Sequence, residues 1–160
     1  MITDSALEFA DALPEGGVLI GLDLGTKTIG LATCDAGWRI ATAGSVLPRG
    51  KFGKNAEAIA TLIEQRKAAG IVLGLPRNMD GTESSRAQAS RSFAQNLLAY
   101  LSAPPRSVSA PVLLWDERWS TLAAERDMIG QDFSRKKRAS RIDSHAAAII
   151  LQGAIDAMTR

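Results

Sequence analysis

The clearest fold signal in this chain is the stretch VLIGLDLGTKTIGLATC (18–34). Its first part, VLIGLDL (18–24), is an apolar run between glycines, which is typical of a buried β-strand. A short glycine-containing turn separates it from a second apolar run, IGLATC (29–34), and another turn precedes a third strand candidate, RIATAGSV (39–46). Three strands joined by short turns predict an antiparallel meander.

After residue 46 the pattern changes to helices that alternate with strands. Some segments carry apolar residues at helical spacing, whereas others are short apolar runs ended by prolines or turn residues. The predicted elements are a helix at 54–69, a strand at 71–75, a helix at 85–101, a strand at 111–117, a helix from 120 to about 129 and a helix at about 142–158. This order predicts an α/β fold with a mixed sheet, in which the later strands run parallel to the first and helices cover both faces.

The size and composition of the chain favour a single domain. It has 160 residues, of which 46% are hydrophobic and 22% are charged, and its net charge is only +2. Such a chain can bury a sizeable core, which excludes wholesale disorder. We expect residues 1–17 to form an N-terminal extension with a short helix at 5–13, and residues 18–160 to form the domain itself.

The N-terminal segment does not resemble a secretory signal, because Asp4, Glu8 and Asp11 stand where a signal needs basic and apolar residues. No apolar run approaches the roughly 20 residues of a membrane span, so no membrane partner is predicted and the expected location is the cytoplasm. The single cysteine and the single histidine exclude an internal disulfide framework, a Cys-based zinc site and a multi-histidine metal site. Acidic side chains remain as the main source of chemistry.

Three acidic residues lie where burial would normally exclude them. Asp23 lies inside the most hydrophobic run, Glu117 closes the strand at 111–117, and Asp143 opens the last predicted helix on its apolar side. An unpaired carboxylate in such surroundings is unstable unless its pKa shifts or a cation neutralises it. Strand ends and helix starts can meet at one edge of a sheet. Mg²⁺ or Mn²⁺ would neutralise clustered carboxylates there, and two such ions are a standard device for phosphodiester hydrolysis.

Each acid also has an ordinary structural alternative. Asp23 can be a turn aspartate, and Glu117 beside Arg118 can belong to a surface ion pair. The segment SRID (140–143) fits the pattern of a helix capping box, so Asp143 can simply cap its helix. The combination of the three acids on this order of elements favours the metal site.

Four motifs, in this order and spacing, resemble the YqgF family of RNase H-like proteins, which are relatives of the RuvC Holliday junction resolvases. The motifs are GLDLGTKTIGLA (21–32), VLGLPRNMDGT (72–82), DERWST (116–121) and IDSHAAAIILQ (142–152). The resemblance covers about residues 20–156. It implies an RNase H-like fold with a five-stranded mixed sheet whose first three strands are antiparallel. It also implies a nuclease that matures the 5′ end of pre-16S rRNA in ribosome biogenesis, with Asp23, Glu117 and Asp143 as catalytic acids that bind Mg²⁺ or Mn²⁺.

Two positions depart from the pattern of the family. Thr28 follows Lys27 where the family usually continues with arginine, and Ala146 stands where resolvase relatives often carry a second acid. A three-acid site is expected to bind one metal tightly and a second only together with substrate, which weakens the transfer of junction-resolving activity. His145, a lone histidine at a helix start, is expected to be structural or exposed rather than a proton-transfer or phosphate contact.

The basic run RKKR (135–138), which precedes Asp143, predicts a contact with nucleic acid. We expect this run to lie on a flexible loop beside the metal site and to hold substrate phosphates with salt-dependent affinity, although a solvated polar loop is the alternative. Lys27 and Arg118 flank two of the acids and could instead pair with Asp23 and Asp116. The predicted substrate-binding residues are Lys27, Arg77, Asn78, Arg118, Arg135, Lys136, Lys137 and Arg138.

The leading interpretation is a metal-dependent nuclease for structured RNA, with precursor rRNA as the expected substrate. A Holliday junction resolvase-like DNA nuclease that acts on branched DNA is the alternative; it would require a symmetric dimer, and either a monomer or a homodimer is compatible with the sequence. The segment DLGT (23–26) also resembles the phosphate loop of actin-like ATPases and sugar kinases, but those need two such domains. A non-catalytic nucleic-acid-binding factor in transcription or translation would not need acids in hydrophobic surroundings.

Overall fold

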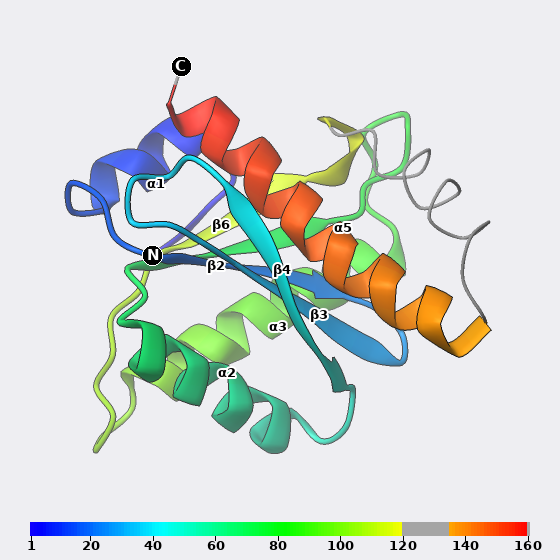
Figure 1. Cartoon of the computed structure of the whole chain (residues 1–160), viewed down its shortest axis with the longest axis horizontal. Helices are drawn as coiled ribbons and strands as arrows, with labels where there is room; N and C mark the ends of the chain where they lie inside the picture. The colour runs from blue at the N-terminus through cyan, green and yellow to red at the C-terminus, as the bar shows by residue number, and fades with distance from the viewer. Residues whose placement is uncertain (120–134, 160) are drawn as a thin grey trace.

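The computed structural model describes residues 1–119 and 135–159, and in the second range it describes the side chains of 145–159. Within these ranges, six strands form one mixed sheet in the order β1-β6-β5-β2-β3-β4 (Figure 1). The strands are β1 (Ile2–Thr3), β2 (Leu19–Leu24), β3 (Thr28–Cys34), β4 (Ala41–Pro48), β5 (Gly70–Leu75) and β6 (Val112–Asp116). The meander of β2, β3 and β4 is antiparallel, as predicted, and β5, β6 and β1 run parallel to β2. The α/β class is therefore confirmed.

The predicted count of five strands is wrong, because β1 adds a strand at the edge of the sheet. It pairs with β6 in the register Ile2↔Val112 and Thr3↔Leu113, and the backbone N–H of Val112 donates to the carbonyl of Met1 at 2.9 Å. A strand of two residues carries no alternation pattern, so the sequence gives no sign of it. The antiparallel strands are consequently the second to fourth in the chain and not the first three.

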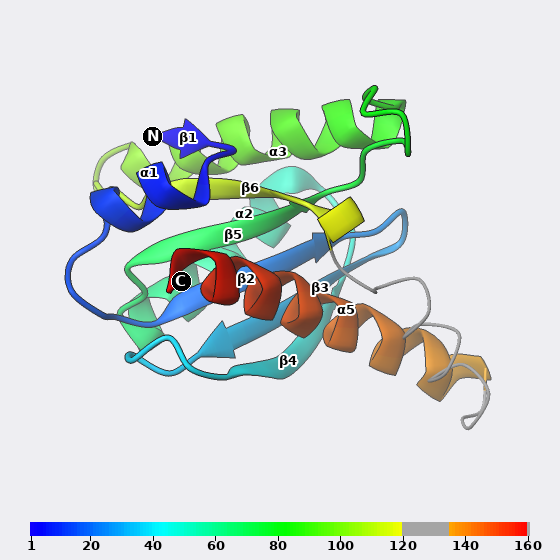
Figure 2. The same cartoon turned by 90° about the horizontal axis from the view of Figure 1, so that it is seen from above.

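Helices cover both faces of the sheet (Figure 1, Figure 2). On one face lie α2 (Phe52–Arg66) and α3 (Ser85–Ser102), and on the other lie α1 (Ala6–Ala12) and α5 (Arg135–Met158). A short 3-10 helix, η1 (Glu117–Trp119), follows β6 directly. The sheet is thus the middle layer of three, and the carboxyl ends of β2, β5 and β6 meet at one edge.

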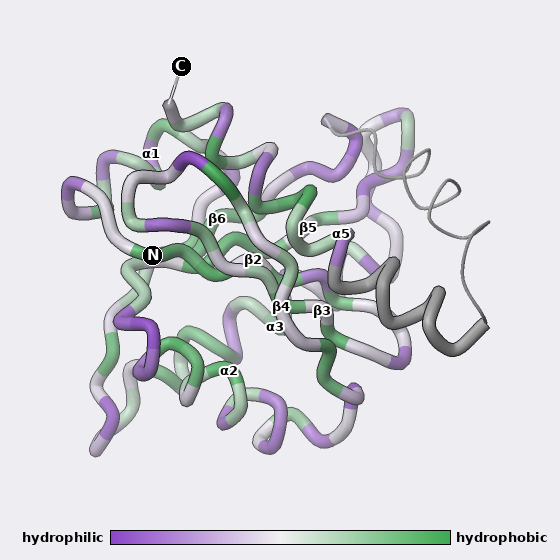
Figure 3. The backbone as a smooth tube through the Cα atoms, in the orientation of Figure 1, coloured by the Kyte–Doolittle hydropathy of each residue, from purple (hydrophilic) through white to green (hydrophobic). Residues whose placement is uncertain are grey.

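Alternation along β2 divides its side chains between two buried cores. Ile20 and Leu22 pack toward α2 and α3, whereas Leu19 packs toward α1 and α5. Figure 3 shows the resulting concentration of hydrophobic residues along the central strands. Phe9 of α1 is completely buried in the second core, so the segment predicted as an N-terminal extension packs against α5.

The last helix begins earlier than predicted. It starts at Arg135 and not near residue 142, so the basic run at 135–138 lies on α5 and the expected loop there is wrong. Arginine and lysine are good helix formers, which allows a helix to extend into a stretch without apolar periodicity. The helix predicted at 120–129 falls outside the described residues. The other predicted helices and strands are present, with ends shifted by a few residues.

Within the described ranges, none of the helices combines the length and the apolar character that crossing a bilayer requires.

Candidate active site at the carboxyl edge of the sheet

Asp23 is a buried carboxylate in the central strand of the sheet. It lies in β2 opposite Gly30 of β3, and the residue is only 3% exposed. Alternation puts it on the face covered by α5, the same side as Gly21. The helix packs closely there, since a Cβ at Gly21 would lie 2.8 Å from the Cβ of Leu151. The C-terminal helix therefore crosses directly over the strand that carries Asp23.

Glu117 reaches the same face of the sheet from η1, just beyond the end of β6. Its Oε1 atom lies over Gly74 of β5, 2.6 Å from the point where a Cβ of that residue would stand. The Cδ1 atom of Ile150, from α5, lies 2.6 Å from the same point. The carboxylate of Glu117 and the side chain of Ile150 thus share the space that the glycine leaves empty.

Gly74 separates the two acids. Because Leu22 of β2 pairs with Leu73 of β5, the next position of β5 lies beside Asp23. Adjacent strands are about 4.8 Å apart, so β2 and β6 are separated by about 10 Å. Because it lies over Gly74, the Glu117 carboxylate covers part of the distance between β6 and β2. The structure therefore brings two of the three predicted acids to one sheet face across a single intervening strand.

The third predicted acid, Asp143, lies in the first turns of α5, and its side chain falls outside the described residues. Its position is two helical turns before Ile150, the residue that shares the space above Gly74. Among the residues whose side chains are described, no group of three His, Cys, Asp or Glu residues could hold a metal ion. The described side chains include two of the three predicted ligands, Asp23 and Glu117, and the metal site itself remains a prediction.

The side chain of Asp116, the residue before Glu117, forms ion pairs with two arginines. The residue is 8% exposed, its Oδ2 accepts a hydrogen bond of 2.6 Å from Nη2 of Arg118, and Nη1 of Arg77 lies 3.7 Å away. Burial raises the pKa of Asp116, but the hydrogen bonds and the charge of Arg118 outweigh it and hold that pKa below its usual value. Of the two roles considered for Arg118, the structure shows the ion pair with Asp116.

Arg77 joins the loop after β5 to the N-terminal segment. Its Nη2 atom lies 3.6 Å from Oδ2 of Asp4 and 3.7 Å from Oε2 of Glu83, in addition to the contact with Asp116. Its Nε atom is buried and has no hydrogen-bond partner among the described atoms. Three carboxylates thus surround this guanidinium and fix the loop at the carboxyl edge of the sheet.

Asn78 and Lys27 lie in exposed loops at the same edge. The Asn78 backbone N–H donates to the carbonyl of Thr82 at 2.9 Å, and its side-chain amide donates to the hydroxyl of Thr82 at 3.0 Å, so Asn78 shapes its own loop. Lys27 lies in the turn between β2 and β3, where its carbonyl accepts a hydrogen bond of 2.9 Å from the N–H of Arg49. The remaining predicted contacts, residues 135–138, lie on α5 with side chains outside the described ones.

Sequence reasoning missed Gly74 as part of the site. A glycine inside a strand weakens the strand and often marks a close approach of another group. The run IVLGL (71–75) carried that signal, but only the structure identifies the Glu117 carboxylate as the approaching group.

Comparison with known proteins finds related sequences along nearly the whole chain. The family model RuvX, described as Holliday junction resolvase, matches residues 17–157. A relative from Novosphingobium aromaticivorans named "Putative pre-16S rRNA nuclease" is 60% identical over 158 residues, which cover 99% of this chain and 97% of that protein. A relative of the same name from Sphingopyxis alaskensis is 57% identical over 160 residues and is covered completely.

Two solved structures share the fold at low sequence identity. The Thermus thermophilus RuvC protein in complex with a Holliday junction substrate has a TM-score of 0.55 at 13% identity, covering 88% of this chain and 94% of that one. The yeast mitochondrial Holliday junction resolvase Ydc2 has a TM-score of 0.52 at 13% identity, covering 96% of this chain and 84% of that one. The arrangement of strands is therefore that of the RuvC-like, RNase H-like proteins. Together with the match along nearly the whole sequence, this confirms the resemblance to YqgF, and the chain belongs to the RuvX (YqgF) family.

Proposed function

We propose that this chain is a nuclease that hydrolyses phosphodiester bonds in structured RNA and processes the 5′ end of pre-16S rRNA in the cytoplasm. The observation that carries the proposal is the Glu117 carboxylate lying over Gly74, on the face that also holds the buried Asp23. Carboxylates gathered in this way repel each other, and a divalent cation relieves that repulsion. The RuvX family and the names of the relatives support the same reaction and the same substrate.

We infer that Asp23, Glu117 and Asp143 together hold Mg²⁺ or Mn²⁺. The described part of this donor set fits such an ion, because carboxylate oxygens are the ligands it prefers and the missing Cβ at Gly74 lets the Glu117 carboxylate lie over β5 on the Asp23 face. When bound, the ion would activate a water molecule for attack on phosphorus and stabilise the leaving oxygen.

The protein's own contribution is to hold the carboxylates in position. The ladders of β2 with β3 and β5 fix the backbone of Asp23, and η1 fixes that of Glu117 at the end of β6. Ile150 packs over Gly74 and limits the access of water from the α5 side. A site preorganised in this way need not rearrange when charge develops on the phosphate.

We further propose that basic residues around this edge bind the phosphates of the substrate. Lys27 is exposed in the turn that follows Asp23, and the four cations at 135–138 lie at the start of α5. Arg118 gives its Nε and Nη2 donors to Asp116 and one N–H of Nη1 to the carbonyl of Met79, which leaves the second N–H of Nη1 for a phosphate. Arg77 and Asn78 would contact the substrate from the loop that follows β5.

The test is a cleavage assay with purified protein and two end-labelled substrates: an RNA that spans the 5′ end of precursor 16S rRNA, and a four-way DNA junction. Each is incubated with Mg²⁺, Mn²⁺ or EDTA. We expect cleavage of the RNA with either metal and none with EDTA. The Asp116→Asn protein serves as a control that changes an acid on the other face of the sheet. Cleavage that persists in EDTA would contradict the metal-dependent reaction.

Cleavage of DNA junctions is the second candidate, favoured by the description of the matching family. Resolution needs two cuts related by symmetry and hence a dimer, whereas trimming of an RNA end can be done by a monomer or by a homodimer. Symmetric cuts in the junction, with the RNA left intact, would replace the first proposal by the second.

A further inference from the structure

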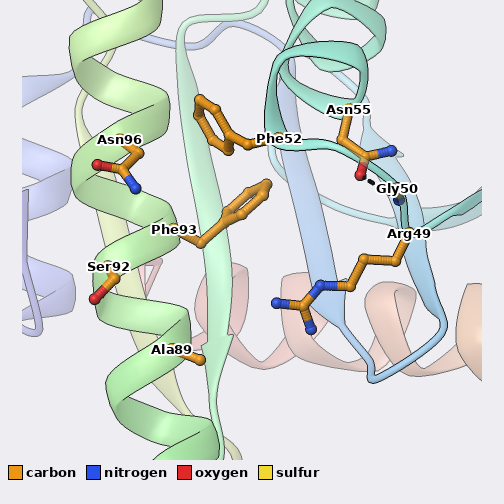
Figure 4. A pocket seen from close by; sticks show the side chains of 8 residues that line it. All are labelled: Arg49, Gly50, Phe52, Asn55, Ala89, Ser92, Phe93 and Asn96. Carbon is orange, nitrogen blue, oxygen red and sulfur yellow. Dashed lines mark hydrogen bonds between the residues drawn. The ribbon is translucent and has the colours of Figure 1, made fainter.

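On the other face of the sheet, a pocket lies between the start of α2 and α3 (Figure 4). It has a volume of about 300 Å³. The lining residues are Arg49, Gly50, Phe52, Asn55, Ala89, Ser92, Phe93 and Asn96. Pockets of about 300 Å³ and above are the size in which proteins bind small organic ligands. We propose that this pocket is a nucleotide-binding subsite that takes one unpaired base of the RNA substrate, with Arg49 on an adjoining phosphate.

The position of the pocket relative to the acids supports the proposal. Arg49 follows β4, and its N–H donates to the carbonyl of Lys27 at 2.9 Å. Its Nη1 atom donates to the carbonyl of Gly25 at 2.5 Å, in the turn that begins two residues after Asp23. The pocket therefore adjoins the same edge of the sheet as the carboxylates. This inference rests on the proposed function, because its ligand is a part of the nuclease substrate.

The charge of the lining matches a nucleic-acid backbone. None of the lining residues is acidic, and Arg49 is the only charged one among them. A guanidinium has five N–H donors, and the Gly25 carbonyl is the one hydrogen-bond acceptor of the Arg49 guanidinium among the described atoms. In Figure 4 its side chain extends from the loop toward α3. The Arg49 guanidinium can therefore donate to a phosphate while it keeps its hydrogen bond to the carbonyl of Gly25.

The apolar part of the lining suits a base. Phe52 and Phe93 lie edge to face, with ring centroids 5.6 Å apart and planes at 78°. Aromatic side chains of this kind stack with bases in proteins that bind single strands. On α3, the side chains of Ser92 and Asn96 are exposed and have no hydrogen-bond partner within the described part of the chain. They can donate to and accept from the edge of a base.

The pocket is also held in shape before any ligand binds. The Asn55 side chain is almost completely buried; its Oδ1 accepts from the N–H of Gly50 at 2.9 Å, and its Nδ2 donates to the carbonyl of Pro48 at 3.0 Å. These two bonds fix the segment that carries Arg49 against the first turn of α2. A preformed pocket loses little entropy when its ligand enters.

The experiment measures binding without cleavage. A fluorescein-labelled single-stranded RNA is titrated in EDTA, and the anisotropy is followed from 50 to 200 mM salt. Ala89→Trp fills the pocket without a change of charge, and Ala99→Trp adds the same side chain at an exposed position of the same helix. Arg49→Gln removes the cation, and Arg66→Gln makes the same change at the far end of α2.

We expect Ala89→Trp to weaken binding about tenfold or more, as the loss of one stacked base does, and to leave the salt dependence unchanged. Arg49→Gln should reduce the slope of log K against log[salt] by about 0.7, the loss of one phosphate contact on a single strand. Neither control should change the affinity or the slope. An RNA that carries an abasic nucleotide at every position should bind the native protein as weakly as normal RNA binds Ala89→Trp.

The proposal is overturned if Ala89→Trp and Ala99→Trp bind RNA equally well, or if the abasic RNA binds as tightly as normal RNA. Should Ala89→Trp fail to fold by circular dichroism, Ser92→Phe fills the same pocket from another exposed position. Failure of the subsite is separate from failure of the proposed nuclease. The first is decided by RNA affinity in EDTA, and the second by the cleavage rate of the native protein with metal.

Discussion

Asp116 and Glu117 are consecutive acids in opposite surroundings. Asp116 is held by hydrogen bonds from Arg118 and by the charge of Arg77. Glu117 instead lies over Gly74, beside Ile150 and on the face of the sheet that holds Asp23. The end of one strand thus provides one carboxylate that is paired with arginines and a second that we propose as a metal ligand. Consecutive acids at the end of a strand point to opposite faces of the sheet, and the groups present on each face give them different surroundings.

The largest loss of activity is expected from neutralising the buried Asp23. Asp23→Asn should lower the cleavage rate by at least about 100-fold, because a metal centre contributes several kcal/mol to catalysis and every 1.4 kcal/mol is a factor of ten. The thermal midpoint should stay the same or rise, because one of several repelling acids is neutralised. Initial rates and a thermal melt measure the two quantities. A midpoint that falls by several degrees would instead make Asp23 a structural residue.

The next effect concerns the basic run at the start of α5. Replacement of Arg135, Lys136, Lys137 and Arg138 by alanine should remove about three phosphate contacts and lower the slope of log K against log[salt] by roughly two to three units. Metal affinity should survive, since the acids are untouched. The control is the Arg39→Ala and Arg66→Ala double variant, which removes exposed cations away from the carboxyl edge. An unchanged slope would leave these residues as a solvated surface of the helix.

A smaller effect tests why Glu117 lies where it does. In Gly74→Ala, the new Cβ would stand 2.6 Å from Oε1 of Glu117 and from Cδ1 of Ile150, so both side chains must move. We expect about tenfold lower kcat, with overpacking that costs about 1–3 kcal/mol of stability, and weaker Mg²⁺ binding by calorimetry. Gly53→Ala is the control, because nothing lies within 4 Å of its Cβ position. Unchanged metal affinity in Gly74→Ala would refute the positioning role of the glycine.

The smallest effect is one on stability, and it concerns the pair of Asp116 and Arg118. Because Arg118 holds the pKa of Asp116 below its usual value, the pair stabilises the fold above the unfolded pKa of an aspartate, and this contribution is lost as the pH falls through the folded pKa. Arg118→Met should therefore lower the free energy of unfolding by about 1–3 kcal/mol at pH 7, and the difference should shrink below about pH 4.

The matched control for that prediction is Arg39→Met. Arg39 also pairs with an aspartate, Asp35, but its side chain is 84% exposed. The pKa of Asp35 is lowered to about 2, and the backbone N–H of Ile40 is the largest cause. Loss of Arg39 should thus lower the free energy of unfolding by less than loss of Arg118 does, at every pH. Denaturant titrations at several pH values compare the two variants, and equal losses would contradict the account of the buried pair.

Much of the fold could be predicted because its signals are local. The run VLIGLDL (18–24) is bounded by glycines, and helix α3 carries an apolar stripe, so both were found. The edge strand β1 was missed because it depends on pairing with β6, more than a hundred residues away, and has no pattern of its own. The start of α5 was missed because a basic stretch without apolar periodicity was interpreted as a loop.

The sequence indicates candidate acids for the site but not how they lie relative to one another. Asp23 and Glu117 were identified because carboxylates are unusual next to apolar runs. Their approach across Gly74 depends on the order of β2, β5 and β6, which only the folded sheet determines. From the sequence, Arg118 could bind a phosphate or pair with Asp116. The structure shows the ion pair with Asp116, which the spacing of the residues does not determine.

The most direct test of the account compares Glu117→Gln with Asp116→Asn in one assay. Both remove one negative charge from adjacent residues, and both are measured on end-labelled precursor 16S rRNA with Mg²⁺, at a temperature where each protein is folded. The account predicts that Glu117→Gln loses at least about 100-fold in cleavage rate, whereas Asp116→Asn cleaves within a few-fold of the native protein and is less stable. Equal losses, or a greater loss in Asp116→Asn, would contradict it.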